Sequence, residues 1–163
     1  MKMKNGIKRI DISQSAAAAE VLRVQLAAYK VEAELIGFAE LPPLKETIKE
    51  LQRSEETFYG FYVNEQLNGV VSLKIEDNVM DIYRLFVHPE QFRKRIAWKL
   101  LVFIQDCEKG FEEIIVSTAA GNQPAIHFYI KSGFSVTSEV KTVEGLAIKR
   151  FSKLLWKVIV TKA

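Results

Sequence analysis

Apolar residues alternate with polar ones, or form short runs, in seven parts of the chain. This spacing predicts strands over residues 7–12, 58–63, 67–75, 79–87, 114–116, 134–140 and 148–160. Short polar separators, 64–66 and 76–78, join the second, third and fourth of these strands. Those three strands are therefore expected to form an antiparallel meander.

Apolar residues spaced three and four apart predict four helices between these strands. The expected helices are one capped by Ser13 or Ser15 that runs to about Lys30, one opened by Pro43, one from Ile96 to near Gly110, and one capped by Asn122 that ends at Gly133. A strand–helix–strand step after an antiparallel meander gives a mixed sheet with helices on its faces.

Length and composition narrow the class of protein. The chain has 163 residues, 48% of them apolar and 26% charged, which predicts a single globular domain over residues 1–163 and argues against disorder. Lys and Arg outnumber Asp and Glu by 23 to 20, a net charge of +3. This charge permits an anionic ligand, but nucleic-acid binders usually concentrate far more positive charge on one face.

Cysteine, histidine and the first residues bear on the compartment. Cys107 is the single cysteine, which excludes an intramolecular disulfide and fits a reducing compartment; it falls on the apolar side of the third helix, so we expect it in the core. His88 and His127 are too far apart in sequence to suggest a metal site. Residues 1–6 lack the apolar run of a signal peptide, and no stretch approaches the ~18 apolar residues of a membrane span. We expect a cytoplasmic protein with no metal and no membrane partner.

Residues 85–97 carry the strongest chemical signal. A strand ends there, a turn follows, and a helix begins, with Arg93, Lys94 and Arg95 at the helix start. The first turn of a helix has unpaired N–H groups and a partial positive charge, which suit a phosphate. The macrodipole disfavours basic side chains at that end, and a bound pyrophosphate would offset this repulsion. A solvated basic turn explains the segment equally well.

The chain resembles the GCN5-related N-acetyltransferase (GNAT) family at this segment and at a second one. Residues 87–97 resemble the family's motif A, Val-x-Pro followed by Gln/Arg-x-x-Gly-x-Gly/Ala. Residues 122–134 meet every fixed position of motif B, Asn-x-x-Ala-x-x-Phe-Tyr-x-x-x-Gly-Phe. Motif A has two departures: Phe92 replaces Gln or Arg, and Arg95 replaces Gly. Arg95 would cost about 1 kcal/mol if the backbone needs a positive φ there, or could itself contact a phosphate.

This resemblance implies an α/β (α+β) protein of the GNAT fold, with a mixed, mostly antiparallel sheet of about six or seven strands and helices on both faces. It implies acetyl-CoA as cosubstrate, bound in a V-shaped opening between the strands at 79–87 and 114–118. The implied coenzyme A contacts are Leu85, Phe86 and Val87 to the pantetheine arm, Phe92, Arg93, Lys94, Arg95, Ile96 and Ala97 around the pyrophosphate, and Asn122 and Tyr129.

The same resemblance implies an acetyl transfer by direct attack of a primary amine on the thioester. Tyr129 holds the family's general-acid position and would protonate the departing thiolate, although packing against Phe128 is the alternative reading. The family builds its acceptor pocket beyond the first helix, where Glu32 and Glu34 are expected. Glu34 is the candidate base, and Glu32, Glu40 and Asp81 are the other candidates. Each of these acids also fits a solvated surface position.

Two alternatives to the enzyme remain open. One is an acyl-CoA-binding or regulatory module on the same fold without turnover, motivated by Arg95 and by the lack of an obvious base. The other is a nucleic-acid binder, suggested by the basic residues of 149–157, although those charges alternate with apolar residues as in a strand with one wet face. The resemblance also allows a homodimer through the last strands, and it leaves the acceptor, a small amine or a peptide amine, unnamed.

Overall fold

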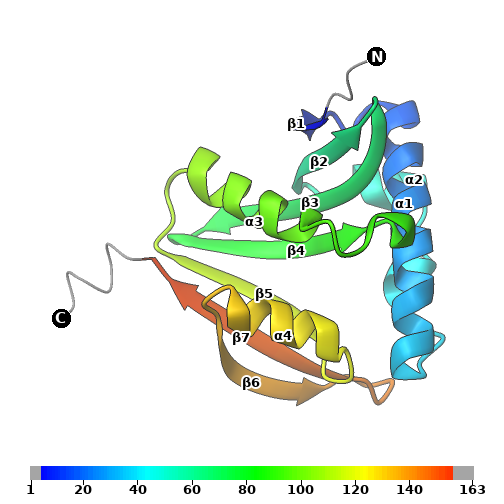
Figure 1. Cartoon of the computed structure of the whole chain (residues 1–163). Helices are drawn as coiled ribbons and strands as arrows, with labels where there is room; N and C mark the ends of the chain where they lie inside the picture. The colour runs from blue at the N-terminus through cyan, green and yellow to red at the C-terminus, as the bar shows by residue number, and fades with distance from the viewer. Residues whose placement is uncertain (1–4, 156–163) are drawn as a thin grey trace. The chain divides into compact units, whose positions relative to one another are not determined.

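The computed structural model describes residues 5–155 (Figure 1). Seven strands form one sheet in the order β1-β2-β3-β4-β5-β7-β6. Their bounds are β1 Asn5–Ile10, β2 Thr57–Val63, β3 Gln66–Glu76, β4 Val79–Val87, β5 Glu113–Ala119, β6 Ser135–Lys141 and β7 Ala147–Leu154. The β4–β5 ladder is parallel, whereas β1–β2, β2–β3, β5–β7 and β6–β7 are antiparallel. The expected mixed, mostly antiparallel sheet of an α+β protein is confirmed.

The chain divides into two compact units. The first unit comprises residues 1–73 and 84–107, and the second comprises 74–83 and 108–163. Strands β3 and β4 contribute to both, since the division falls inside each of them. The prediction of a single domain over residues 1–163 stays a prediction, and each unit is described by itself below.

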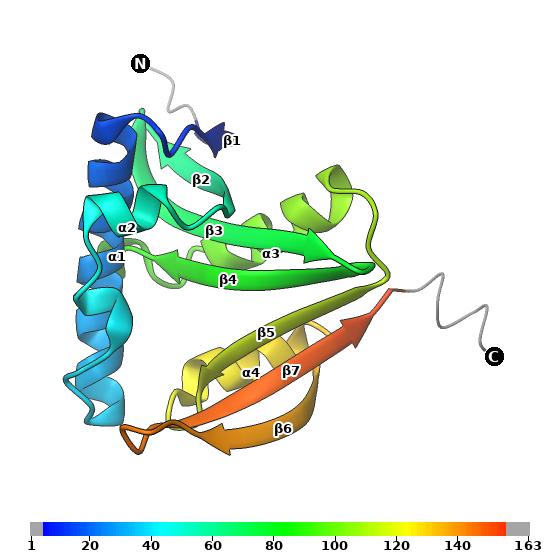
Figure 2. The ribbon, with the colours of Figure 1, turned by 180° about the vertical axis from the view of Figure 1, so that it is seen from behind.

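The first unit has helices on both faces of its strands. Its helical elements are α1 Ser15–Ile36, the 3-10 turn η1 Pro42–Leu44, α2 Ile48–Gln52, the 3-10 turn η2 Pro89–Gln91 and α3 Ile96–Cys107. Phe58 of β2 lies in a buried cluster with α1, while the next residue, Tyr59, meets Phe103 of α3 with ring centroids 5.3 Å apart. Since successive strand residues point to opposite faces, α1 and α3 cover opposite faces of this part of the sheet (Figures 1 and 2).

The second unit packs α4 Gln123–Lys131 against one face of β5, β7 and β6 (Figure 2). Phe134 and Phe151 are buried, and both contact the ring of Tyr129 from α4 at centroid distances of 5.5 Å. Asn122 caps α4 as predicted, because its side-chain oxygen accepts a hydrogen bond from the N–H of Ala125 at 3.2 Å. The strand pattern here is confirmed up to Leu154, where β7 ends; residues 156–160 of the last predicted strand lie outside the described residues.

The first predicted helix boundary is wrong at both ends. Helix α1 continues through Glu32 and Glu34 to Ile36, and Gly37 ends it in the left-handed conformation with φ 69°. Ala and Glu are good helix formers, so nothing in residues 31–36 stops the helix before that glycine. At the other end the N-cap is Gln14 without a side-chain bond, because the Ser13 hydroxyl donates to Asp11 instead, at 2.6 Å.

Two further expectations fail locally. Pro43 opens only η1, and α2 begins after Thr47, which forms a reciprocal capping box with Glu50. Cys107, expected in the core, is exposed. It is the last residue of α3, and the buried stripe of that helix already ends at Ile104.

Candidate functional site

The turn between β4 and α3 lies entirely in the first unit and, with the end of β4 and the start of α3, holds most of the predicted coenzyme residues. His88 begins it: its N–H donates to the Asn68 carbonyl at 2.8 Å, and its Nδ1 accepts from the N–H of Glu90 at 3.2 Å. The N–H of Gln91 donates back to the His88 carbonyl at 2.8 Å. The start of the turn is therefore pinned to β3 and to itself, which fixes where α3 begins.

Residues 93–95, at the end of the turn, have an uncommon backbone conformation. Arg93 and Arg95 have φ of 66° and 61°, which non-glycine residues rarely adopt. Within the part of the chain that the structure describes, the N–H groups of Arg93, Lys94 and Arg95 donate to no carbonyl. Unpaired N–H groups in left-handed turns beside a helix start form a concave anion site. The turn therefore fits a pyrophosphate, with three basic side chains at the same place.

Arg95 occupies the glycine position of the family pattern and keeps the left-handed backbone that glycine would favour. Its guanidinium lies 4.4 Å from the ring centroid of Trp98, one turn further along α3. A cation over an exposed indole contributes about 0.5–1 kcal/mol, comparable with the roughly 1 kcal/mol cost of the left-handed conformation. The stacking therefore offsets the strain that the arginine introduces.

Arg95→Gly should consequently change the free energy of unfolding by less than about 1 kcal/mol, since strain and stacking are lost together. Arg95→Val loses the stacking and places a β-branched residue at φ 61°, so its loss should be larger, about 1–2 kcal/mol. Urea denaturation of the two variants measures the difference. Equal stability of both would show that the turn changes its backbone to suit the side chain.

The predicted pantetheine residues lie at the end of β4. Phe86 is buried and packs edge-on against Tyr29 of α1, with centroids 5.8 Å apart; Val87 is also buried, and Leu85 is half-buried. At the start of α3, Ile96 is buried and Ala97 half-buried, whereas Phe92 is exposed. The four-pair ladder to β5 joins residues 79–82 to 113–116 and ends before Leu85. Leu85–Val87 and Phe92–Ala97 thus all lie in the first unit, on the two sides of the turn, and their contacts with coenzyme A stay a prediction.

Asn122 and Tyr129 belong to the second unit. Asn122 caps α4, so its amide oxygen has a structural partner whatever else it binds. Tyr129 is 5% exposed, and its ring contacts Phe128 at a centroid distance of 5.3 Å in addition to Phe134 and Phe151. The packing alternative is therefore realised for the ring, and a role for the hydroxyl stays a prediction.

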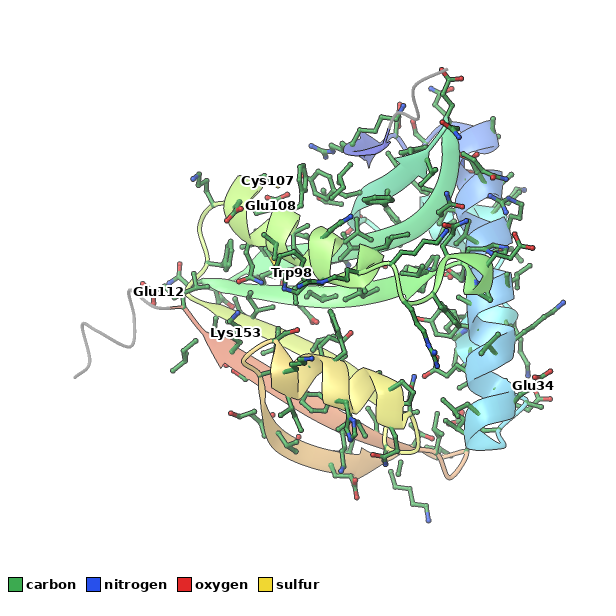
Figure 3. All side chains as sticks on the ribbon, in the orientation of Figure 1. Glu34, Trp98, Cys107, Glu108, Glu112 and Lys153 are labelled. Atoms are coloured by element: carbon green, nitrogen blue, oxygen red, sulfur yellow. The ribbon has the colours of Figure 1, made fainter. Side chains whose placement is uncertain are left out.

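The candidate bases are spread out. Glu34 lies in the last turns of α1, not beyond the helix as expected, and its exposed side chain points outward (Figure 3). Glu40 pairs with Lys45 on the surface. Asp81 is half-buried in β4, in the second unit. The role of Glu34 stays a prediction.

A buried polar cluster that the sequence did not reveal lies in the first unit. We call it the Arg84 network; its members are Gln25 of α1, Glu46, Glu56, Ser72 of β3 and Arg84 of β4. The Arg84 guanidinium donates to Glu46 through Nη1 and, at 2.9 Å, through Nη2. It donates to Glu56 through Nε at 2.8 Å and through Nη2 at 3.2 Å. The side chains of Arg84, Glu46 and Glu56 are only 11%, 17% and 5% exposed.

Two neutral side chains complete the network. Gln25, fully buried, accepts from Arg84 at 2.9 Å and donates to Glu46 at 2.8 Å and to the Pro43 carbonyl at 3.0 Å. The Ser72 hydroxyl donates to Glu56 at 2.6 Å. One guanidinium against two carboxylates leaves a net charge of −1. The sequence signals are an amide on the apolar side of a helix, Gln25, and an arginine inside an apolar strand run, Arg84.

Burial and charge set the protonation of this network. Burial alone would raise the pKa of Glu46, but hydrogen bonds from Arg84 and Gln25 outweigh it and hold that pKa below its usual value. The carboxylates raise the pKa of Arg84 despite burial, so it stays charged. Burial raises the pKa of the neighbouring Tyr29 well above its usual value, and Glu32 adds to this, so the phenol stays protonated.

The lowered Glu46 pKa predicts a stability that depends on acid pH. A carboxyl whose pKa is lower in the folded state contributes stability above its unfolded pKa, about 4.3, and loses it as the pH falls through the folded value. The urea midpoint should therefore fall on acidification below about pH 4.5 in the wild type, and less steeply in Glu46→Gln. Parallel pH curves for the two proteins would show that Glu46 carries none of the acid sensitivity.

Among residues 5–155, none of the helices combines the length and the apolar character of a membrane span. The same residues contain no group of three or more His, Cys, Asp and Glu side chains placed to hold a metal ion.

Comparisons with known proteins support the family resemblance seen in the sequence. Residues 24–134 match the model of the acetyltransferase (GNAT) family. The chain is 39% identical over 145 residues to UPF0157 protein YqkA of Bacillus subtilis, covering 89% of this chain and 42% of that protein. It is 30% identical over 95 residues to spermidine N(1)-acetyltransferase of Thermoplasma acidophilum, covering 57% and 59%. The chain thus spans about half the length of these curated relatives.

Solved structures show the same fold. The PaiA N-acetyltransferase of Thermoplasma acidophilum, crystallised with coenzyme A, superposes with a TM-score of 0.75 at 22% identity, over 95% of this chain and 100% of that one. An N-acetyltransferase from Staphylococcus aureus gives 0.70 at 17% identity, over 93% and 98%. With the family model matched across both motif segments, the chain belongs to the GNAT acetyltransferase family.

Proposed function

We propose that the protein is an acetyl-CoA-dependent N-acetyltransferase that transfers the acetyl group to a primary amine. The observation that carries the proposal is the turn at Arg93–Arg95, where unpaired N–H groups and positive φ angles lie directly before α3. These groups suit the pyrophosphate of coenzyme A, and family membership supports that ligand. The bound cosubstrate supplies an activated acetyl thioester.

The chain's own groups then have defined tasks. Backbone groups of Leu85–Val87 hold the pantetheine arm in an extended form, as an added strand would be held, and an N–H there stabilises negative charge on the thioester oxygen. The acceptor nitrogen forms a bond to the carbonyl carbon while the carbon–sulfur bond breaks. Tyr129 donates its proton to the sulfur, and a base takes one proton from the amine. The pKa of an ordinary tyrosine is about 10, so such a phenol carries a proton at neutral pH that it can donate. A thiol has a pKa of about 8.5.

The acceptor amine needs a base to remove its proton. Glu34 is the proposed base from the family resemblance, and its exposed position suits transfer of the proton through water. The relative from Thermoplasma acidophilum is named for spermidine, which supports a polyamine as one candidate class of acceptor. Amino acids and peptide termini are the other classes.

Titration calorimetry with coenzyme A, followed by incubation with acetyl-CoA and a panel of polyamines, amino acids and peptides, tests the proposal. We expect coenzyme A to bind, and one amine class to release free coenzyme A in proportion to acetylated product. Absence of coenzyme A binding by the intact protein would refute the proposal. As a matched control, Lys30→Gln removes an exposed charge that is not among the predicted coenzyme A contacts and should leave binding unchanged.

The alternative is an acyl-CoA-binding or regulatory module on the same fold. It is favoured by the outward position of Glu34, which leaves the predicted base on the surface. Tight coenzyme A binding without release from any amine, and with no effect of Tyr129→Phe, would favour this module over the enzyme.

A further inference from the structure

Arg84 connects parts of the first unit that are distant in sequence. Its guanidinium bonds to Gln25 on α1, to Glu46 between η1 and α2, and to Glu56 just before β2, while its backbone lies in β4. Ser72 ties Glu56 to β3 at the same point. Three separate segments therefore meet β4 through one side chain, and β3 joins them through Glu56.

The segment between α1 and α2 is joined to β4 through this side chain. Residues 37–47 contain η1, whose own backbone bonds are local, from Leu44 to Leu41 and from Lys45 to Pro42. Phe38 bonds to Ala33 of α1 and Thr47 caps α2, so these bonds reach only the two flanking helices. The bonds of this segment at Pro43 and Glu46 reach Gln25 and Arg84. The link between this segment and β4 is the pairing of Glu46 with Arg84.

The position of Arg84 on β4 relates this link to the proposed thioester site. Arg84 immediately precedes Leu85, and it points to the same face as Phe86, which α1 covers through Tyr29. The Arg84 side chain therefore ties the 37–47 segment to the strand that carries Leu85–Val87.

Stability alone does not account for a buried arginine between two carboxylates. Such ionic clusters can often be replaced by apolar residues of similar volume without loss of stability. A planar guanidinium that donates to both carboxylates and to an amide instead fixes the angles between the segments, which an ammonium group or an apolar side chain does not do.

We propose that Arg84 is a positioning residue that holds segment 37–47 against β4, so that the amine meets the thioester at the correct angle. This segment follows the first helix, where the family resemblance implies the acceptor pocket. This inference rests on the proposed acetyl transfer. It assigns no proton transfer and no direct substrate contact to Arg84.

The test compares three variants with the wild type, using the best amine of the panel. Arg84→Lys keeps the charge but loses the planar fork. Arg84→Met combined with Glu46→Gln and Glu56→Gln removes all three charges together, so that no carboxylate is left unpaired. Arg9→Lys, an exposed arginine on β1, is the matched control.

We expect Arg84→Lys and the triple variant to lose about tenfold or more in kcat/KM for the amine, because small misplacements of reacting groups are costly. Affinity for coenzyme A, measured by calorimetry, should stay within about twofold in all variants, and Arg9→Lys should match the wild type. Hydrogen exchange at the Leu44 and Lys45 amides should be faster in both Arg84 variants.

The outcomes separate this proposal from the proposed function. A wild type that acetylates the amine, with an Arg84→Lys variant or a folded triple variant of equal kcat/KM, overturns the positioning role alone. Unchanged exchange at Leu44 and Lys45 in both Arg84 variants overturns it as well. A wild type that binds no coenzyme A refutes the proposed function and this inference together.

Discussion

Replacement of Arg84 by methionine is expected to lower the free energy of unfolding by about 3–5 kcal/mol. Glu46 and Glu56 are 17% and 5% exposed, and both lose their guanidinium partner in this variant. A buried carboxylate without a positively charged partner keeps the cost of moving its charge out of water. That cost is larger than the net gain of the original ion pair. Urea denaturation at pH 7 measures the loss.

The matched control for this loss removes the carboxylates as well. With Glu46→Gln and Glu56→Gln added, the buried charge disappears, and most of the lost stability should return even though the arginine is still absent. A loss below about 1 kcal/mol in Arg84→Met alone would contradict the argument, because it would mean that water reaches both carboxylates.

The strands and helices near the two family motifs were predictable because local signals there agree with the tertiary structure. The strand over 79–87 was predicted with the bounds that β4 has, and the helix after Asn122 has its predicted cap. In both places Pro, Gly or a capping side chain marks the boundary within one or two residues. The family pattern has glycine at the position of Arg95, where a positive φ would be costly for arginine. Arg95 does have a positive φ, of 61°.

The end of α1 was not predictable in the same way. Residues 31–36 mix apolar and acidic side chains without a clear stripe, and the helix continues there because Gly37 is the first residue that ends it well. Glu34 is therefore a helix residue on an exposed face and not part of a loop. Its proposed role as a base was linked to a place beyond the helix, and the helical position removes that reason.

The Arg84 network could not be predicted because its members are far apart along the chain. Gln25, Glu46, Glu56 and Arg84 come from four segments. Gln25 and Arg84 stand out among apolar neighbours, but nothing in the sequence indicates which residues they meet. Only the fold brings one guanidinium to two carboxylates and an amide. Pairing at such sequence distances leaves no spacing signal in a single sequence, in contrast to the family's motif B, where all positions lie on one helix and its flanks.

Tyr129 combines a structural ring with a hydroxyl that the proposed reaction needs. Its ring is packed by Phe128, Phe134 and Phe151, so the side chain has one defined direction. Phenylalanine keeps that ring and those contacts, and removes only the hydroxyl. The substitution therefore separates packing from proton transfer more cleanly than a change to alanine would.

Tyr129→Phe is accordingly expected to lower kcat for acetyl transfer by about 100-fold, the lower end of what a positioned general acid contributes. Coenzyme A affinity should stay within about twofold, because the loss falls on a step that occurs only in the transition state. Stopped assays of free thiol release against amine concentration, together with calorimetry, measure both quantities. Tyr83→Phe, which removes the hydroxyl of an exposed tyrosine, is the control and should retain the wild-type rate. If Tyr129→Phe also retains it, the hydroxyl has no part in the transfer, the thiolate leaves with a proton from water, and Tyr129 serves the fold of the second unit alone.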